Sequence, residues 1–255
     1  IDIKYIEPLG KNLYLNLSYT GSADFSDSRR IATDHLTGYR DTLNTFDYTN
    51  RNIRNNATVS MRYKREKIEI MAGADFNSSV QLRSEVFPES FEYPATFNHI
   101  APYLSMEFNI PFFKLTVGYN ESTVIPSIEQ LRGVIDNSSP LFLTAGNPEL
   151  EHTVCRNAKL NILYSDVAAA ATWGLTVDYE ERSNYIAKKT MFFAADTEME
   201  NYGYVAPAGS QLSLPVNVDG CRNLSSSLSC NFRVADLNST FFTALNYNFG
   251  QTPYF

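Results

Sequence analysis

Apolar and polar residues alternate along most of this chain, in runs of about ten residues that are separated by turns. In one such run Ile68, Ile70, Ala72, Ala74 and Phe76 share a face, and the residues between them are mostly polar. A period of two is that of a β-strand with one apolar and one polar face. Comparable runs begin near Leu13, Ala57, His99, Leu115, Ala158, Trp173, Leu228 and Phe241. The pattern predicts an all-β chain of about ten antiparallel strands.

The length of the runs and the position of the aromatic residues favour strands that cross a membrane. A tilted strand needs about 9–11 residues to cross a bilayer, whereas strands of globular proteins usually have about five or six. The chain has 16 Tyr and 17 Phe residues, and rings near strand ends form the interfacial girdles of outer-membrane barrels. The candidates for these girdles are Tyr19, Tyr63, Phe108, Tyr119, Tyr164, Tyr179 and Tyr247.

The connections between the runs alternate between short and long, as in outer-membrane barrels with short periplasmic turns and long external loops. Short turns are predicted at Glu7–Lys11, Lys64–Glu66, Ile110–Phe113, Ser165–Ala171 and Val234–Asn238. External loops are predicted at Ser26–Asn50, Arg83–Phe97, Ser122–Leu150 and Met191–Gln211. We therefore expect residues 1–255 to form a single domain, an antiparallel transmembrane β-barrel in the outer membrane of a Gram-negative cell.

Composition agrees with this prediction. The net charge is −7 and the sequence pI about 5.0, and no basic stripe with interleaved aromatics is present, which argues against nucleic acid as a partner. No run of eighteen apolar residues exists, so a transmembrane helix is not expected. Because Ile1 begins within a strand-like run without a signal peptide, and Pro253 interrupts the last one, we expect the chain to be a fragment of a larger barrel, without its plug domain.

The residues that most often carry chemistry form no recognisable site. Cys155 and Cys221 are predicted to face the lumen with one strand between them, too far apart for a disulfide, and Cys230 faces the opposite side. The three histidines, His35, His99 and His152, have no metal-ligand spacing. No metal or other cofactor is expected, no basic cluster favours a phosphate, and an enzyme is the least favoured function.

Two sets of residues are candidates for a binding role. Aromatic residues in the predicted loops, which could stack on a sugar, peptide or chelate, are Tyr39, Tyr48, Phe87, Phe91, Tyr93, Phe142, Phe192, Phe193, Tyr202 and Tyr204. Charged residues on the predicted lumenal face are Arg62, Glu69, Asp75, Glu107, Lys114, Lys159, Asp178 and Glu180. The aromatics could equally pack the loops together, and the charges could line a substrate path, pair across strands or meet a plug domain.

The stretch from Ile125 to Thr153, IPSIEQLRGVIDNSSPLFLTAGNPELEHT, is the most specific part of the sequence. Pro126 at a first helical position predicts one helical turn, and DNSSP and GNP predict turns. The elements PSIEQL, DNSSPL and GNPEL, together with Glu7-Pro8-Leu9-Gly10 and PVNVDG from Pro215, resemble the outer-membrane β-barrel of TonB-dependent receptors over nearly the whole chain.

This resemblance implies the C-terminal part of a 22-stranded barrel that imports a scarce external ligand through a plugged lumen. The implied partners are outer-membrane lipid, a plug domain of the same polypeptide, TonB acting through an N-terminal part, and a surface lipoprotein. Two alternatives remain. A porin-like channel or adhesin would share the strands and lack a plug, and a soluble all-β binding domain would stay in solution without detergent.

Overall fold

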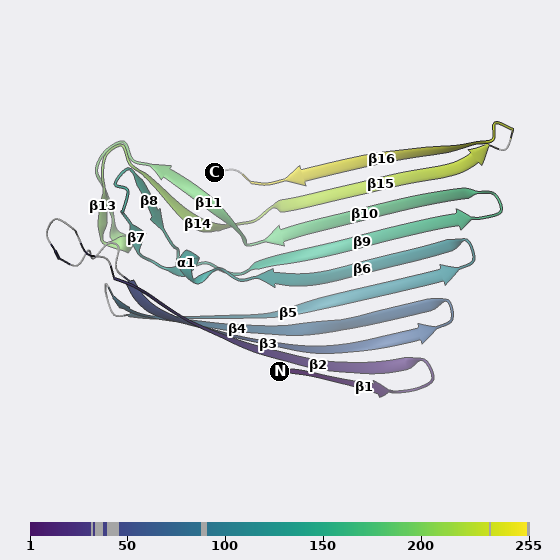
Figure 1. Cartoon of the computed structure of the whole chain (residues 1–255), viewed down its shortest axis with the longest axis horizontal. Coiled ribbons are helices and arrows are strands. Elements are labelled where there is room, and N and C mark those ends of the chain that lie inside the picture. Colours follow the sequence, from purple (N-terminus) through teal and green to yellow (C-terminus); the bar gives the residue numbers. More distant parts are fainter. Residues whose placement is uncertain (32, 34–37, 40–45, 88–90, 235, 254–255) are drawn as a thin grey trace.

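Ten long strands form one antiparallel sheet in the computed structural model, which describes the chain apart from residues 32, 34–37, 40–45, 88–90, 235 and 254–255. It also leaves out the side chains of Phe46, Phe87, Phe91 and Tyr93. The strands, in their order across the sheet, are β1 (Asp2–Pro8), β2 (Leu13–Arg30), β3 (Phe46–Arg65), β4 (Ile68–Phe87), β5 (Phe91–Ile110), β6 (Phe113–Val124), β9 (Thr153–Asp166), β10 (Ala171–Ser183), β15 (Cys221–Val234) and β16 (Ser239–Gln251). The predicted fold class and strand number are confirmed (Figure 1). Short turns alternate with long connections as predicted, except between β4, which ends at Phe87, and β5, which begins at Phe91.

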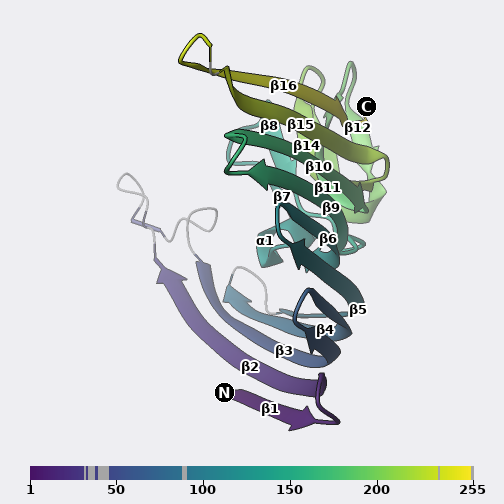
Figure 2. The same cartoon turned by 90° about the vertical axis from the view of Figure 1, so that its right-hand side faces the viewer.

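The sheet is strongly bent, and its two faces differ in chemistry. Figure 2 looks along the strands and shows the arc, with the short helix α1 (Ile128–Leu131) on its concave side. Gln81 and Glu85 of β4 contact the segment around α1, so alternate positions of each strand face the concave side. The apolar set lies on the convex face, where large side chains are exposed, including Val59, Phe76, Ile100, Trp173 and Leu228. In a soluble protein an apolar face of this extent would be covered.

The ladder between β5 and β6 opens towards one end. The two strands pair only from Tyr103↔Asn120 to Ile110↔Phe113, although β5 continues to pair with β4 as far as Glu85↔Phe91. The part of β5 that precedes Tyr103, where the structure describes it, has no ladder partner on the β6 side. The strands separate visibly in Figure 1 at the end that carries the long connections, which we call the loop end; the opposite end is the turn end.

The two longest described connections fold together at the loop end. Residues 125–152 and 184–220, which we call the cap, contain α1 and a small sheet in the order β11-β14-β8-β7 (Figure 1). Its strands are β7 (Ile135–Asp136), β8 (Phe142–Ala145), β11 (Tyr185–Phe192) and β14 (Gln211–Val218), and a hairpin of β12 (Thr197–Met199) and β13 (Tyr204–Ala206), joined through the 3₁₀ turn η1 (Glu200–Tyr202), packs beside them. No helix within the described residues is long and apolar enough to cross a membrane.

The cap has its own small hydrophobic core. The buried side chains of this core come from β8, β13 and β14 and are Leu143, Ala145, Ala206 and Leu212. Phe193, Met191 and Met199 pack around them. The cap is therefore a folded unit attached to the main sheet and not a set of independent loops.

The loop boundaries predicted from the sequence are too wide. The loop predicted at Arg83–Phe97 lies in β4 as far as Phe87 and in β5 from Phe91. The loop predicted at Ser26–Asn50 is shorter, because β2 extends to Arg30 and β3 begins at Phe46. Lys188, which the sequence pattern predicts near the outer end of the strand from Trp173, lies instead in β11, outside the main sheet. Gln81, Arg83 and Glu85 of β4 are polar because they contact the cap, and polar residues of this kind are also typical of a loop.

The three cysteines are free and buried. Cys155 of β9 and Cys221 of β15 both stand opposite Arg182 of β10 in the ladder, so a whole strand separates them. Cys230 lies nine positions beyond Cys221 in the same strand and therefore faces the other side of the sheet. The strand order thus keeps the thiols apart.

Candidate ligand-binding site

The helix α1 begins at a well-formed N-cap. The Ser127 side chain accepts a hydrogen bond from the Gln130 amide at 3.2 Å, and the Gln130 side chain accepts one from the Ser127 amide at 2.9 Å, which completes a capping box. The predicted single turn is confirmed, with the difference that Pro126 precedes the N-cap and is not the first helical residue. On the main sheet, Gln81 Nε2 donates to the buried Pro126 carbonyl at 3.2 Å.

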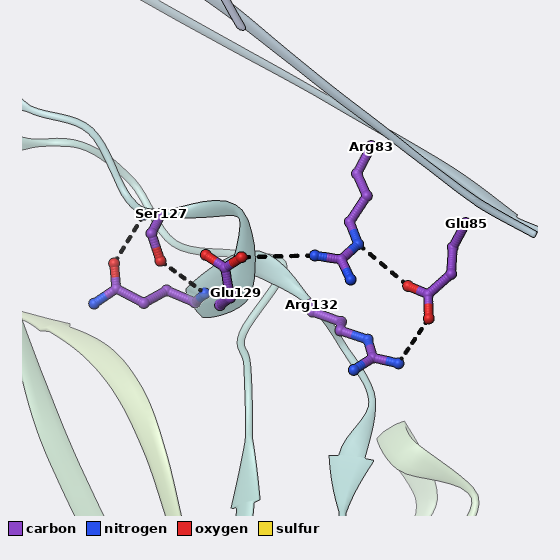
Figure 3. Close-up of polar contacts among 6 residues, drawn as sticks. Arg83, Glu85, Ser127, Glu129 and Arg132 are labelled. Carbon is purple, nitrogen blue, oxygen red and sulfur yellow. Dashed lines mark hydrogen bonds and ion pairs between the residues drawn. The ribbon is translucent and has the colours of Figure 1, made fainter. Parts of the chain in front are cut away.

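A network of charges, with Arg83 and Glu85 buried at its centre, joins α1 to the main sheet (Figure 3). The Glu85 carboxylate on β4, whose side chain is 0% exposed, accepts from Arg83 Nε at 3.2 Å and from an Arg132 terminal nitrogen at 2.9 Å. A terminal nitrogen of Arg83 lies 3.7 Å from the Glu129 carboxylate of α1. The Arg83 guanidinium also stacks 3.7 Å above the ring of Tyr48, a favourable cation–π arrangement.

Gly146, directly after β8, allows the cap to close on α1. Its amide donates to the Arg132 carbonyl at 3.0 Å, and the next amide, that of Asn147, donates to the Gln130 carbonyl at 2.6 Å. A Cβ at position 146 would lie 2.3 Å from the Arg132 carbonyl oxygen, closer than any side chain tolerates. The hydroxyl of Tyr202 donates to the Gly146 carbonyl at 3.0 Å. Close backbone contact therefore holds Arg132 in place.

A cavity of about 590 Å³ lies between the cap and the main sheet. Tyr48 and Arg83 line it from the main sheet, Arg132 from the end of α1, and Lys188 and Ser213 from the small sheet. Cavities that bind small molecules usually measure about 300–1,000 Å³. The space is large enough for a ligand of that class.

The electrostatics of this cavity mix both signs. The Ser138 amide, 2.9 Å from Asp136 Oδ1, lowers the pKa of that carboxyl, with further help from the Ser138 hydroxyl and the charge of Arg132. Two buried atoms of the lining, Arg132 Nε and Ser213 Oγ, have no hydrogen-bond partner among the described residues. Buried polar atoms are normally satisfied, so these two mark where a ligand or water would bind.

A second cavity, of about 450 Å³, opens where β5 and β6 separate. Phe97, His99 and His152 line it, and the ring of His152 stands edge-on to those of His99, at 5.4 Å, and Phe97, at 6.1 Å. His99 Nε2 lies 3.3 Å from Glu121 Oε2, a contact that bridges β5 and β6 beyond their last ladder pair. Burial lowers the pKa of His152, and the nearby His99 lowers it further, against a smaller opposing effect of Glu151.

The two histidines that sequence spacing separated therefore meet in the fold, and His35 lies outside the described residues. Within the residues that the structure describes, no three His, Cys, Asp or Glu side chains are arranged to hold a metal ion.

The predicted aromatic residues do not converge on one site. Tyr48 lines the larger cavity, whereas Phe193, Tyr202 and Tyr204 pack against the cap core. Phe142 and Phe192 are exposed on cap strands, and Tyr39 is exposed in the connection after β2. Phe87, Phe91 and Tyr93 lie on β4 and β5 and not in a loop, and their side chains are outside the described part. A ligand-binding role for these aromatics stays a prediction.

The predicted lumenal charges form pairs along the main sheet. The ion pairs and hydrogen bonds that involve them include Arg62–Glu69 at 2.6 Å, Lys114–Glu107 at 3.0 Å, Lys159–Asp178 at 3.5 Å, Arg182–Glu180 at 2.6 Å and Thr58–Asp75 at 2.5 Å. Neighbouring strands supply both partners in all but the Arg182 pair. The sequence alone left this pairing as one of three possibilities.

Sequence reasoning missed the residues that shape the larger cavity. These residues come from three segments that are distant in sequence, and they are Arg83, Glu85, Arg132, Lys188 and Ser213. No cluster of basic residues in the sequence therefore indicates the site. One signal was available, since Gln81, Arg83 and Glu85 continue the alternation of β4 on its polar face. Buried charges in a strand extension indicate a partner segment packed on it.

Comparisons with known proteins agree with this architecture. A model of the outer membrane protein beta-barrel family matches residues 1–253. No curated protein matches the sequence. The predicted resemblance to the barrels of TonB-dependent receptors is confirmed at the level of fold.

Three solved structures give the extent of that likeness. The copper transporter OprC has 10% identity and a TM-score of 0.61 over 98% of this chain and 37% of that chain. The FrpB iron transporter from Neisseria meningitidis has 7% identity and a TM-score of 0.55, over 97% and 34%. The hemophore receptor HasR of Serratia marcescens, solved with its hemophore HasA and heme, has 12% identity and a TM-score of 0.55, over 98% and 41%. The chain thus spans well under half the length of each, and the likeness concerns the fold.

Proposed function

This chain belongs to the outer membrane protein beta-barrel family. We propose that it forms the ligand-binding part of the barrel of an outer-membrane import receptor. Its convex apolar face meets lipid and its concave polar face lines a lumen, as the outer-membrane location of the family requires. In this proposal the loop end is extracellular, since barrels of this kind have short periplasmic turns and long external loops.

The cap is the single observation that carries this proposal. A passive channel needs an open mouth, whereas here a folded cap lies on the concave side at the loop end, attached through the buried Glu85 carboxylate (Figure 3). It encloses a cavity of ligand size. Two proteins of similar fold are named as transporters and one as a receptor, which supports import over adhesion.

The partners follow from the same proposal. A plug domain of the same polypeptide would occupy the concave side, where paired polar side chains such as Thr58–Asp75 and Asn56–Asn77 form a wetted wall. TonB would act on that plug from the periplasm, and a surface lipoprotein would meet the external face of the cap. Ten strands would then supply part of a larger closed barrel, because unpaired strand edges are not stable in lipid.

Conductance of the full-length protein tests this function. We would purify it from outer membranes, measure its intact mass, and record current across planar bilayers that contain it. A plugged receptor should have a plug-sized segment beyond these residues and should show no steady current until that segment is deleted. A steady ionic current from the intact protein would instead establish a porin-like channel.

A further inference from the structure

Hydrogen-bond donors that line the larger cavity lack acceptors among the described residues. Arg132 Nε is buried without a partner among the described residues, and an arginine nitrogen can only donate. Ser213 Oγ is likewise without a partner, in a residue that is 9% exposed. Lys188, which is exposed, lines the same space and forms no ion pair within the described residues. An unsatisfied buried donor costs about 1–3 kcal/mol, so a ligand that supplies acceptors is favoured.

The acidic residues that line the cavity, Glu129 and Asp136, and the neighbouring Glu85 already have partners. Glu85 lies between Arg83 and Arg132, and Glu129 lies 3.7 Å from an Arg83 nitrogen. Asp136 accepts from the Ser138 amide at 2.9 Å. Because these carboxylates have protein partners, the free donors of the cavity are not matched by free acceptors.

The positions of the donors follow from the small sheet. Ser213 of β14 stands opposite Thr190 of β11, and Lys188 stands opposite Pro215 two residues along, so Ser213 and Lys188 belong to the same face of the sheet. The neighbouring Leu212 is in the cap core on the other face. The face that carries Ser213 and Lys188 is therefore turned to the cavity and to Arg132.

We propose that this cavity binds an anionic oxygen group, a carboxylate or a phosphate, that belongs to the imported ligand. Arg132 Nε–H, the Ser213 hydroxyl and the Lys188 ammonium donate to it, and charge-assisted bonds of this kind are the stronger class. The proposal rests on the receptor function proposed above and names the chemical group that the receptor recognises.

The size and the apolar lining of the cavity indicate the chemistry of the rest of the ligand. A carboxylate or phosphate fills only a small part of 590 Å³, and the apolar residues Val134 and Ile186 line the same cavity. The ligand class that fits is a small molecule with one anionic group on a largely apolar body.

Anion binding to the full-length protein in detergent tests this proposal. Sodium phosphate and sodium acetate would each be titrated calorimetrically at constant ionic strength, with sodium chloride as the reference. The variants are Lys188→Met and Ser213→Ala, which leave the contacts of Glu85 intact. The matched control is Lys189→Met, since Lys189 is next to Lys188 on β11 but does not line the cavity.

We expect phosphate, acetate or both to bind the wild-type protein more tightly than chloride. Loss of one charge-assisted bond should weaken this binding about tenfold in Lys188→Met, with a smaller loss in Ser213→Ala and none in Lys189→Met. Binding of phosphate alone, or of acetate alone, would identify which anionic group the site takes.

Two results would overturn the proposal: wild-type protein that binds neither anion better than chloride, or Lys188→Met and Ser213→Ala that both bind as wild type does. The conductance experiment is independent of these titrations. A plugged, non-conducting protein without anion binding would reject the anion site alone, whereas a steady current would reject the receptor.

Discussion

At the scale of single residues, the charges of this protein divide into a buried set and an exposed set, and their energies should differ accordingly. The Glu85 side chain is fully buried between two arginines, whereas Glu107 and its partner Lys114 are 44% and 42% exposed. Exposed pairs contribute about 0–1 kcal/mol, but removing one partner of a buried pair costs about 3–5 kcal/mol.

We therefore predict that Glu85→Ala detaches the cap from the main sheet, because it leaves two arginines without their shared carboxylate. Trypsin should then cut after Arg132, Lys188 or Lys189 in the cap of the folded, full-length protein faster than in wild type. Glu107→Ala is the control and should leave this rate unchanged. Equal protection of the cap in wild type and Glu85→Ala would contradict the prediction.

His152 should make stability depend on pH. Burial and the neighbouring His99 lower the pKa of His152 in the folded state below its usual value of about 6.5. The unfolded chain therefore binds the proton more readily, so this contribution to stability is present above pH 6.5 and is lost as pH falls through the lowered pKa.

The melting temperature of the full-length protein should accordingly fall less between pH 7.5 and 5.5 in His152→Gln than in wild type. Removing the Glu151 carboxylate should lower the pKa of His152 further, because that carboxylate opposes the effect of burial. The melting temperature of such a variant should therefore fall more than that of wild type between pH 7.5 and 5.5. The same pH dependence in His152→Gln and wild type would show that the histidine pair carries no such effect.

At the scale of elements, the sequence predicted the strands and turns that are determined by residues adjacent in the chain. The strand from Ile68 and the helical turn after Ser127 were both predicted, because alternation and capping are properties of adjacent residues. The small sheet of the cap was not predicted, since β8 pairs with β14 about seventy residues later along the chain. The cavity between the cap and the main sheet depends on that pairing and was not predicted for the same reason.

Gly146 gives an element-scale prediction. In Gly146→Ala the new Cβ would lie 2.3 Å from the Arg132 carbonyl oxygen, so α1 and β8 must move apart. Overpacking of this kind costs about 1–3 kcal/mol. Hydrogen–deuterium exchange at residues 127–147 of the full-length protein should become faster, whereas Gly10→Ala, which has no atom within 4 Å of its Cβ, should exchange as wild type does. Unchanged exchange in Gly146→Ala would mean that the cap tolerates the added methyl group.

At the scale of the whole molecule, the two faces of the sheet predict opposite responses to an added charge. Leu228 is exposed on the convex apolar face, opposite Leu175 and Leu245 on the neighbouring strands. Its neighbour Ser227 faces the concave side among polar residues.

Location in the outer membrane was predictable because every strand that crosses the lipid has the same apolar and polar alternation. Ligand chemistry was not, because it depends on a few residues that only the fold brings together.

We predict that Leu228→Arg destabilises the full-length protein in lipid by about 2–4 kcal/mol, because the charge enters hydrocarbon. Ser227→Arg should change stability by less than about 1 kcal/mol, since the lumenal face is wet. Urea unfolding in lipid vesicles measures both. A Ser227→Arg variant as damaged as Leu228→Arg would mean that the convex face is not the lipid face.

The parallel pairing of β8 with β14 also sets an order of events during biogenesis. The segments that meet, residues 142–144 and 211–213, are separated in sequence by the whole β9–β10 hairpin. Contacts between distant segments form late, because the intervening chain must first be brought to one place. We therefore expect the β9–β10 hairpin to form before β8 meets β14, so that a newly made chain passes through an open, uncapped stage before it reaches its mature form.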